Sequence, residues 1–405
     1  MKCVLHIGTE KTGSTLLQDW LYQNRKQLSK QRLYLSNILG KNNNRRLVSY
    51  FQRELDDWTS RNKISSQQEK KYYFDGFTND FVNEIVKASR DHDVFLVTSE
   101  HFHSRLKDKE EIKALQQFLQ HEFDSVKVVC YFREQMQMAS SLYSTAVKGP
   151  YTTTLDDYFD RVTPSNYYYN YKEIADNWSG SFGRQNCEFR IYDKARFVEQ
   201  DLRKDLLSCL DMQFDFDLFD YTIESSNESL SQLESQLYRA TNELIPYWED
   251  ENGNASRENI NVKSRISSIE CIKHGRVESA HMVAGMRMFS ESNKLFFNEY
   301  FDGKYLFPIA PVDYKDEKKQ ISFTIDQVAE IVGELFKEFL LDVKSSKHLL
   351  TDSDVDCLRD LALGYEKSIK LTLNDAFKLM EIAGKARPEG PLIKKKLSEY
   401  KARLT

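Results

Sequence analysis

The segment Gly8–Thr15, with the sequence GTEKTGST, combines residue types that bind anions. It follows the short apolar run CVLHI and leads directly into an amphipathic helical pattern. The first N–H groups of a helix lack internal acceptors and lie at the positive end of the helix dipole, so such a turn favours phosphate. Gly8 and Gly13 let the backbone approach the anion closely, and Lys11 adds a positive charge. Three hydroxyl groups can donate further hydrogen bonds: Thr12, Ser14 and Thr15.

The position of the lysine separates this loop from the phosphate-binding loop of common ATPases and GTPases. In the pattern G-x-x-x-x-G-K-[ST] the lysine follows the second glycine, whereas Lys11 precedes Gly13 by two positions. The sequence therefore predicts a phosphate cradle of another kind. The competing interpretation is a glycine-rich turn between a strand and a helix that binds no ligand.

The stretch GTEKTGSTLLQ resembles the 5′-phosphosulfate loop of sulfotransferases, which use 3′-phosphoadenosine 5′-phosphosulfate. A second motif fits the same family: Arg133, after the apolar run VKVVCYF, is followed eight residues later by Ser141. In sulfotransferases an arginine and a serine at this spacing bind the 3′-phosphate, a task that suits a guanidinium fork and a hydroxyl. The alternative is an arginine at the sheet edge and a serine small enough for helix packing, and Ser140 offers a competing hydroxyl.

A third stretch, CEFRIYDKARF, is similar to the family segment in which a strand ends in Tyr-Glu-Asp. The resemblance implies that Tyr192 contacts the adenine. Because YDK stands here in place of YED, a buried aromatic at the strand end is the alternative. The family often completes its 3′-phosphate site with Arg-Lys-Gly in the C-terminal part. This chain has only KHGR at Lys273–Arg276, which leaves the last phosphate contact unassigned.

The segment VTSEHFHS holds the candidates for a general base. The resemblance implies that a histidine or a glutamate after this strand takes the proton of the acceptor. Glu100 is favoured because it comes directly after FLVTS, and in an extended chain His101 and His103 lie on the opposite face. His103 stays in reserve, since an ordinary histidine pKa of about 6.5 suits a base. The alternative is that these polar residues cap the following helix or anchor a loop.

Alternating apolar runs and amphipathic patterns must position these residues. Strands are predicted at CVLHI, DVFLVTSE and VKVVCYFRE, and helices near Tyr73–Ser89, over Lys109–His121 and over EQMQMASSLYSTAVK. This repetition predicts an α/β fold with a P-loop-like parallel β-sheet and helices on both faces. Because ligands of such sheets bind at the carboxyl ends of the strands, we expect Lys11, Glu100 and Arg133 to lie in one crevice.

The alternation of strands and helices ends near Pro311. We therefore expect residues 1–310 to form the α/β domain and residues 311–405 to form a helical C-terminal region. The apolar positions of this region have helical spacing over Val328–Leu341 and Val355–Leu379, so the apolar face of each segment must pack against another surface. Three roles stay open for this region: packing on the α/β domain, formation of a homo-oligomer, or binding of a partner.

Composition excludes several classes of protein. The 405 residues are 40% hydrophobic and 29% charged, and a net charge of −5 gives no general attraction to nucleic acid or an anionic membrane. No apolar run approaches the ~18 residues of a membrane span, and the loop starts too near Met1 for a signal peptide. Six cysteines without a C-x-x-C pair argue against a zinc site and a disulfide framework, so a reducing cytoplasm fits best.

The resemblance implies a sulfotransferase that needs no metal and transfers a sulfuryl group from its nucleotide co-substrate to an acceptor hydroxyl, and the cysteine content favours the cytoplasm as its location. Adenosine 3′,5′-bisphosphate is the expected product, and Lys11 is expected to neutralise charge on the bridging oxygen. The acceptor is expected to be a sugar, a polysaccharide or a glycolipid. Two other classes stay open: a nucleoside or small-molecule kinase that uses ATP, and a nucleotide-binding scaffold without catalytic activity.

Overall fold

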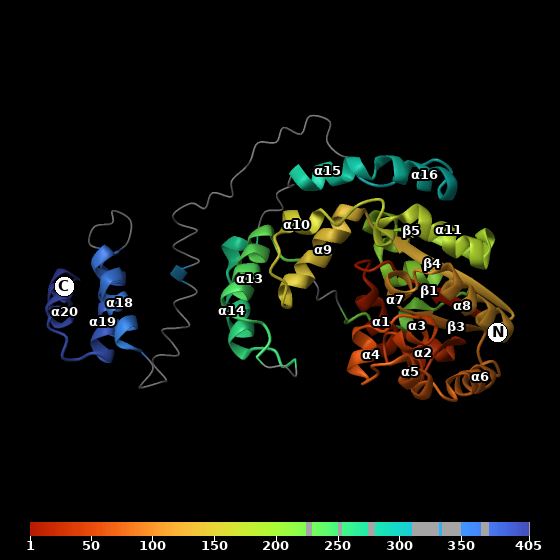
Figure 1. The fold of residues 1–405 in the computed structure, drawn as a ribbon, viewed down its shortest axis with the longest axis horizontal. Coiled ribbons are helices and arrows are strands. Elements are labelled where there is room, and N and C mark those ends of the chain that lie inside the picture. The colour runs from red at the N-terminus through yellow and green to blue at the C-terminus, as the bar shows by residue number, and fades with distance from the viewer. Residues whose placement is uncertain are drawn as a thin grey trace. The chain divides into compact units, whose positions relative to one another are not determined.

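The computed structural model describes residues 1–223, 229–249, 253–273, 280–309, 332–333, 350–365 and 372–404. The chain divides into two compact units, Met1–Leu244 with Arg276–Lys318, and Ile245–Gly275 with Lys319–Thr405. The first unit contains the β-sheet, and residues 245–275 are grouped with the C-terminal helices. Figure 1 shows the elements of each unit.

A five-stranded, all-parallel sheet forms the centre of the first unit, in the order β2-β3-β1-β4-β5. Its strands are β1 (Lys2–His6), β2 (Leu33–Leu35), β3 (Val94–Thr98), β4 (Ser125–Phe132) and β5 (Cys187–Ile191). Leu5 of β1 pairs with Val97 of β3 on one side and with Val128 of β4 on the other. The loop after β1 therefore starts between the ends of β3 and β4, and the predicted α/β fold is confirmed.

The strands are apolar at almost every position because helices cover both faces of the sheet (Figure 1). Val4 and Leu96 belong to the buried cluster on one face, and their neighbours Leu5 and Val97 belong to the cluster on the other. The cluster with Val4 and Leu96 includes side chains of α1 (Ser14–Gln23), α2 (Arg25–Lys30) and α12 (Leu202–Ser208). The other cluster includes side chains of α6 (Phe77–Ala88), α8 (Lys109–Glu122), α11 (Tyr171–Phe182) and α16 (Ser290–Tyr300).

The remaining α-helices of the first unit and the 3-10 helix η1 connect these elements. They are α3 (Arg45–Phe51), α4 (Asp57–Arg61), α5 (Gln67–Tyr73), α7 (His101–Arg105), α9 (Gln135–Lys148), α10 (Leu155–Phe159), the 3-10 helix η1 (Tyr167–Tyr169), α13 (Gln232–Leu244) and α15 (Ala280–Met288). The helices predicted from the sequence correspond to α6, α8 and α9 and are confirmed. Neither β2 nor α7 was predicted.

The second unit is helical in its described part. Its helices are α14 (Arg257–Ser267), α18 (Asp352–Tyr365), α19 (Leu373–Ala386) and α20 (Pro391–Leu404). An apolar core joins α18, α19 and α20 through side chains that include Leu358, Met380 and Tyr400. α18 starts with reciprocal hydrogen bonds between Thr351 and Asp354, which cap its first turn. The predicted segment Val328–Leu341 lies outside the described residues, except for residues 332–333.

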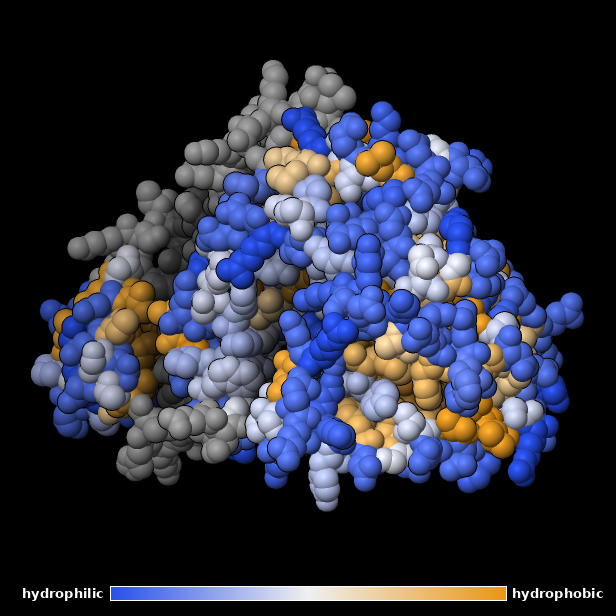
Figure 2. All heavy atoms as spheres, turned by 45° about the vertical axis from the view of Figure 1, so that its right-hand side comes forward, coloured by the Kyte–Doolittle hydropathy of each residue, from blue (hydrophilic) through white to orange (hydrophobic). Residues whose placement is uncertain are grey.

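The face of the chain shown in Figure 2 is mainly hydrophilic, with apolar side chains in scattered groups. Across the described ranges, no helix is both long enough and apolar enough to cross a lipid bilayer. Four cysteines, Cys3, Cys130, Cys187 and Cys209, are buried as free thiols. Within the same ranges, no group of three or more His, Cys, Asp or Glu side chains has the arrangement of a metal site.

Candidate functional site

The loop after β1 is tied to β4 before it reaches α1. The N–H of Thr9 donates to the carbonyl oxygen of Tyr131 at 2.8 Å, and the N–H of Tyr131 donates to the carbonyl oxygen of Gly8 at 2.7 Å. Gly8 has a φ of +102°, and a Cβ atom there would lie 3.0 Å from the Cα atom of Glu100. Glycine is therefore required by the backbone conformation and by the close approach of the segment that follows β3.

Gly13 marks the start of α1 and has a φ of +75°. A Cβ atom there would lie 2.5 Å from the side chain of Leu202 and 3.4 Å from the ring of Tyr192. Among the described residues, no side chain caps the first turn of α1. Its first N–H groups therefore lack a side-chain acceptor, which is the arrangement that favours a bound anion.

The three hydroxyl groups predicted to bind the anion have different surroundings. The hydroxyl of Thr12 donates to the carbonyl oxygen of Thr9 at 2.5 Å, so it closes the loop on itself. Ser14 is buried at the start of α1, and Thr15 is exposed. Thr12 thus stabilises the loop conformation, and Ser14 and Thr15 are the hydroxyls of the loop that lie at the helix start.

Lys11 lies between α9 and the end of β4. Its Nζ donates to the hydroxyl of Thr145 at 2.8 Å, and its carbonyl oxygen accepts a hydrogen bond from Nη1 of Arg133 at 3.1 Å. Burial lowers the pKa of the Lys11 ammonium, and the carboxylates of Glu10 and Glu100 partly counteract this shift. The hydrogen bond to Thr145 and the nearby carboxylates therefore fix the position of the Lys11 ammonium beside the loop.

Arg133 and Tyr192, which follow β4 and β5, lie beside each other. The guanidinium carbon of Arg133 is 5.7 Å from the centre of the Tyr192 ring, within cation–π distance. On α9, the hydroxyl of Ser140 donates to a carbonyl of its own helix at 2.9 Å, whereas the hydroxyl of Ser141 accepts a hydrogen bond from Ser229 at 3.3 Å. Of the two serines, Ser141 is therefore the one that points away from its own backbone.

Thr145 follows Ser141 by one helical turn, so both residues lie on the same side of α9. The hydroxyl of Thr145 also donates to the carbonyl oxygen of Ser141 at 3.2 Å. Lys11 is hydrogen-bonded to Thr145 and to Arg133, so the loop, α9 and the end of β4 meet at Lys11. A phosphate-bearing ligand at the start of α1 would have a lysine, an arginine and two hydroxyls of α9 around it.

Glu100 lies on the other side of the loop, against Gly8. Its Oε2 atom accepts hydrogen bonds from Nε2 of Gln18 at 2.7 Å and from Nδ2 of Asn43 at 3.0 Å. The charge of Glu100 also raises the pKa of Lys11, so the two groups share one local electrostatic environment. The carboxylate favoured as the base thus lies beside the lysine loop.

His103 occupies a different environment. β3 ends at Thr98 and α7 begins at His101, so the side-chain alternation expected for an extended chain does not continue to His103. The His103 ring is fully buried, and its Nε2 lies 3.0 Å from the carbonyl oxygen of Tyr168. Because a carbonyl only accepts, Nε2 carries the proton. Burial lowers the pKa of His103 to about 4, which makes its other nitrogen a weak base.

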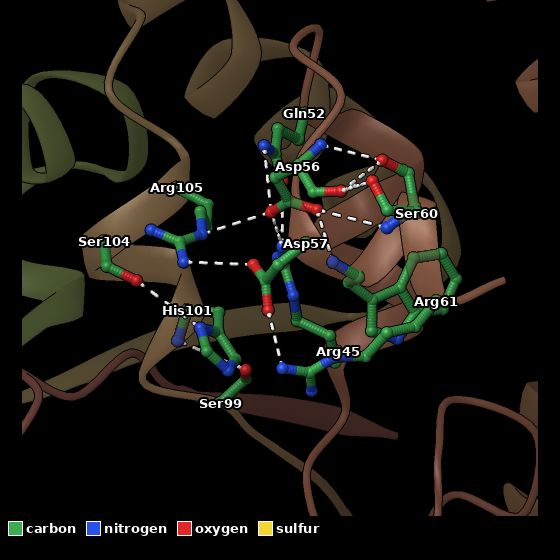
Figure 3. Close-up of polar contacts among 12 residues, drawn as sticks. Arg45, Gln52, Asp56, Asp57, Ser60, Arg61, Ser99, His101, Ser104 and Arg105 are labelled. Atoms are coloured by element: carbon green, nitrogen blue, oxygen red, sulfur yellow. Dashed lines mark hydrogen bonds and ion pairs between the residues drawn. The ribbon is translucent and has the colours of Figure 1, made fainter. Parts of the chain in front are cut away.

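His101 begins α7 and contacts neighbouring hydroxyls (Figure 3). Its N–H donates to the hydroxyl oxygen of Ser99 at 3.3 Å, and its Nδ1 lies 3.5 Å from the hydroxyl of Ser104. Burial lowers the pKa of His101, and the positive charge of Arg45 acts in the same direction, whereas Glu100 raises it. Its ring is therefore neutral at neutral pH.

An ion network joins the start of α3 to the end of α7 (Figure 3). Asp56 pairs with Arg45 and, at 3.1 Å, with Arg105, which also pairs with Asp57 at 3.3 Å. Burial alone would raise the pKa of Asp56, but Arg45, the neighbouring amides and Arg105 lower it, so this carboxylate stays ionised. The network joins α3 and the start of α4 to α7, the helix that follows Glu100.

Glu10, directly before Lys11, was not recognised in the sequence as a site residue. Burial alone would raise its pKa, but hydrogen bonds from Ser104 and Tyr168, together with the nearby ring of His103, outweigh burial and lower it. An ionised Glu10 therefore lies close to α7 and to η1. Gln18, Asn43 and Thr145 were missed as well. Their only sequence signals are a polar run, GKNNNRR, and hydroxyl or amide residues inside helical patterns.

The structure thus brings Lys11, Arg133, Ser141 and Tyr192 to one side of the loop and Glu100 to the other. His103 is fully buried in the core. Of the predicted segment Lys273–Arg276, residues 274–276 lie outside the described residues.

An uncharacterized protein from Archaeoglobus fulgidus is 25% identical to this chain over 214 residues. The match covers 53% of this chain and 56% of that protein, so the chain spans about half the length of this relative. Neither a protein-family model nor a solved structure matches the chain. Because the relative is itself uncharacterized, the match carries no function to this chain.

Proposed function

We propose that this protein is a sulfotransferase that moves a sulfuryl group from 3′-phosphoadenosine 5′-phosphosulfate to an acceptor hydroxyl. The observation that carries the proposal is the contact of Arg133 with the lysine loop: Nη1 of Arg133 donates to the Lys11 carbonyl oxygen at 3.1 Å, although 122 residues separate them. The sequence resemblance pairs these two motifs on one nucleotide. Their contact in the fold supports that pairing.

The residues around the loop fit such a nucleotide by their chemistry. Arg133 and Ser141 would hold its 3′-phosphate, and the first N–H groups of α1 would hold its 5′-phosphosulfate. Tyr192, which lies against Gly13 and under the Arg133 guanidinium, offers an aromatic face for the adenine. Lys11 supplies the positive charge that stabilises the leaving phosphate oxygen.

The nucleotide supplies the sulfuryl group: a bond from its sulfur to the acceptor oxygen forms while the bond to the phosphate oxygen breaks. Glu100 takes the proton of the acceptor hydroxyl. Glu100 lies across the loop from the Arg133 side and close enough to Lys11 to raise its pKa, so charge neutralisation and proton removal would act near each other. We propose a sugar, a polysaccharide or a glycolipid as the acceptor, on the basis of the family resemblance, and the cytoplasm as the location.

Thermal shift and calorimetric titration test the nucleotide part of the proposal. Adenosine 3′,5′-bisphosphate should raise the melting temperature more than adenosine 5′-monophosphate, because a ligand that binds only the folded state stabilises it. Arg133→Ala should weaken binding of the bisphosphate roughly 30-fold, or ~2 kcal/mol, and remove the preference. Arg53→Ala is the matched control, since Arg53 is exposed and pairs with Asp108.

Transfer of radioactive sulfate from the nucleotide to a panel of oligosaccharides and glycolipids tests the reaction itself. Stronger stabilisation by ATP with magnesium than by the bisphosphate would replace the proposal with a kinase. Binding of the bisphosphate without transfer to any acceptor, and without slow hydrolysis of the co-substrate, would favour a scaffold. Equal affinity of the wild-type protein for nucleotides with and without the 3′-phosphate would refute the role of Arg133.

A further inference from the structure

The segment Gly40–Asn44 lies against the carboxylate to which the proposed function assigns proton transfer. We infer that Asn43 is a positioning residue for Glu100: it holds one carboxylate oxygen so that the other is available to the acceptor hydroxyl. The inference rests on the proposed function for the role of Glu100. The contacts that carry it do not depend on any ligand.

Two side-chain amides bind the same oxygen of Glu100. Nδ2 of Asn43 donates to Oε2 at 3.0 Å, and Nε2 of Gln18 donates to Oε2 at 2.7 Å. In the part of the chain that the structure describes, Oε1 accepts no hydrogen bond. Oε1 therefore keeps its lone pairs for an incoming proton, and the carboxylate cannot rotate without breaking two hydrogen bonds.

The amide of Asn43 has only one possible orientation. A carboxylate oxygen accepts but does not donate, so the amide nitrogen faces Glu100 and Oδ1 faces away from it. On that side the hydroxyl of Ser99 donates to Oδ1 at 2.6 Å, and the oxygen of Ser99 accepts the N–H of His101 at 3.3 Å. This chain of hydrogen bonds starts and ends in the segment that carries Glu100.

The backbone around Asn43 is fixed by the sheet. The N–H of Asn44 donates to the carbonyl oxygen of Thr98 at 3.0 Å, and Oδ1 of Asn44 accepts the N–H of Thr98 at 2.8 Å. Gly40 has a φ of +119°, and a Cβ atom there would lie 2.5 Å from the carbonyl oxygen of Asn43. Arg45 is anchored in the ion network of Figure 3. The end of β3 therefore determines where the amide of Asn43 lies.

A double-mutant cycle tests the inference. Asn43→Leu removes the amide at similar volume, and we expect kcat to fall at least about tenfold while the KM for the nucleotide changes less than about twofold. In a Glu100→Gln background the same substitution should reduce kcat less than about twofold further, because residues that act through one another are not additive. Asn42→Leu is the matched control in the same turn: the amide of Asn42 donates to Asp19 at 2.6 Å, and kcat should stay within about twofold.

Crystal structures of the ligand-free variants give a readout that is independent of activity. The Glu100 carboxylate should change its rotamer in Asn43→Leu and keep it in Asn42→Leu. If Asn43→Leu does not fold, Asn43→Ala replaces it, since it fills less space.

The inference is overturned if Asn43→Leu keeps the wild-type kcat, if the losses of Asn43→Leu and Glu100→Gln multiply, or if Asn42→Leu loses as much activity. An unmoved carboxylate in Asn43→Leu also overturns it. If the wild-type protein transfers no sulfuryl group, the proposed function fails, and the carboxylate position in the variants still decides whether Asn43 positions Glu100.

Discussion

Acidification should destabilise this fold through two buried histidines. The rings of His6 and His103 are fully buried, and each makes a single hydrogen bond, to the hydroxyl of Thr98 at 2.8 Å and to the carbonyl oxygen of Tyr168 at 3.0 Å. Burial lowers the pKa of each ring to about 4. In the unfolded chain a histidine has a pKa of about 6.5, so between these two values the unfolded chain binds more protons than the folded chain.

The sign and the size of the effect follow from this difference. Stability is fully present above about pH 6.5 and is lost as the pH falls toward about 4, because protons then favour the unfolded chain. For one histidine with pKa values of about 6.5 and about 4, linkage predicts a loss of about 2 kcal/mol between about pH 8 and about pH 5. His6 and His103 together should therefore cost about 4 kcal/mol over this range.

Urea unfolding at about pH 8 and about pH 5, followed by tryptophan fluorescence, measures this loss. Trp20 and Trp178 are buried on the two faces of the sheet and report on the α/β unit. His103→Gln keeps a nitrogen donor for the Tyr168 carbonyl but cannot titrate, so its loss should be about 2 kcal/mol smaller than that of the wild type. His121→Gln is the control, because the side chain of His121 is 83% exposed. Equal losses in His103→Gln and the wild type would refute the reasoning.

Three further predictions concern the site. Glu100→Gln should lower kcat about 100-fold or more with nucleotide affinity little changed, whereas the kcat of His103→Gln should stay within about threefold of the wild type. An active Glu100→Gln variant with an inactive His103→Gln variant in the same transfer assay would make the histidine the base. Lys11→Met should lower kcat about 100-fold or more while leaving the melting temperature within a few degrees, and turnover within about tenfold of the wild type would remove Lys11 from the mechanism. Gly13→Ala should lower the free energy of unfolding by roughly 1–2 kcal/mol, because the φ of Gly13 is +75°. Gly180→Ala, in an exposed position of α11, should not lower it. Equal urea midpoints for the two variants would contradict the strain at Gly13.

The sheet was predictable because a parallel strand that is covered on both faces is apolar at nearly every position. β1, β3 and β4 meet this condition and were predicted within a few residues. β2 was not predicted, because Leu33–Leu35 is too short to show a strand pattern of apolar residues and two of its three side chains are only partly buried. α7 was not predicted either, because the polar residues of TSEHFHS suit a strand end as well as a helix start.

The lysine loop was predictable because its residues are contiguous, and Arg133 was predictable because it directly follows a strand of the sheet. The partners of Glu100 were not. Gln18 and Asn43 are 82 and 57 residues away from it in sequence, and an amide in a helix or in a polar run is usually a solvated surface residue. Only the fold brings them to one carboxylate. Sequence reasoning therefore identified the charged candidates and missed the two amides that contact Glu100.

Two carboxylates lie close enough to Lys11 to raise its pKa, and their surroundings suit them to different tasks. Glu10 lies near the hydroxyls of Ser104 and Tyr168, and its lowered pKa makes it a weak base. Glu100 is bound through one oxygen, by two amides that carry no charge. Because both hydrogen bonds go to Oε2, they orient the carboxylate and leave its second oxygen available. This arrangement supports the proposal that Glu100, rather than Glu10, takes the proton beside Lys11.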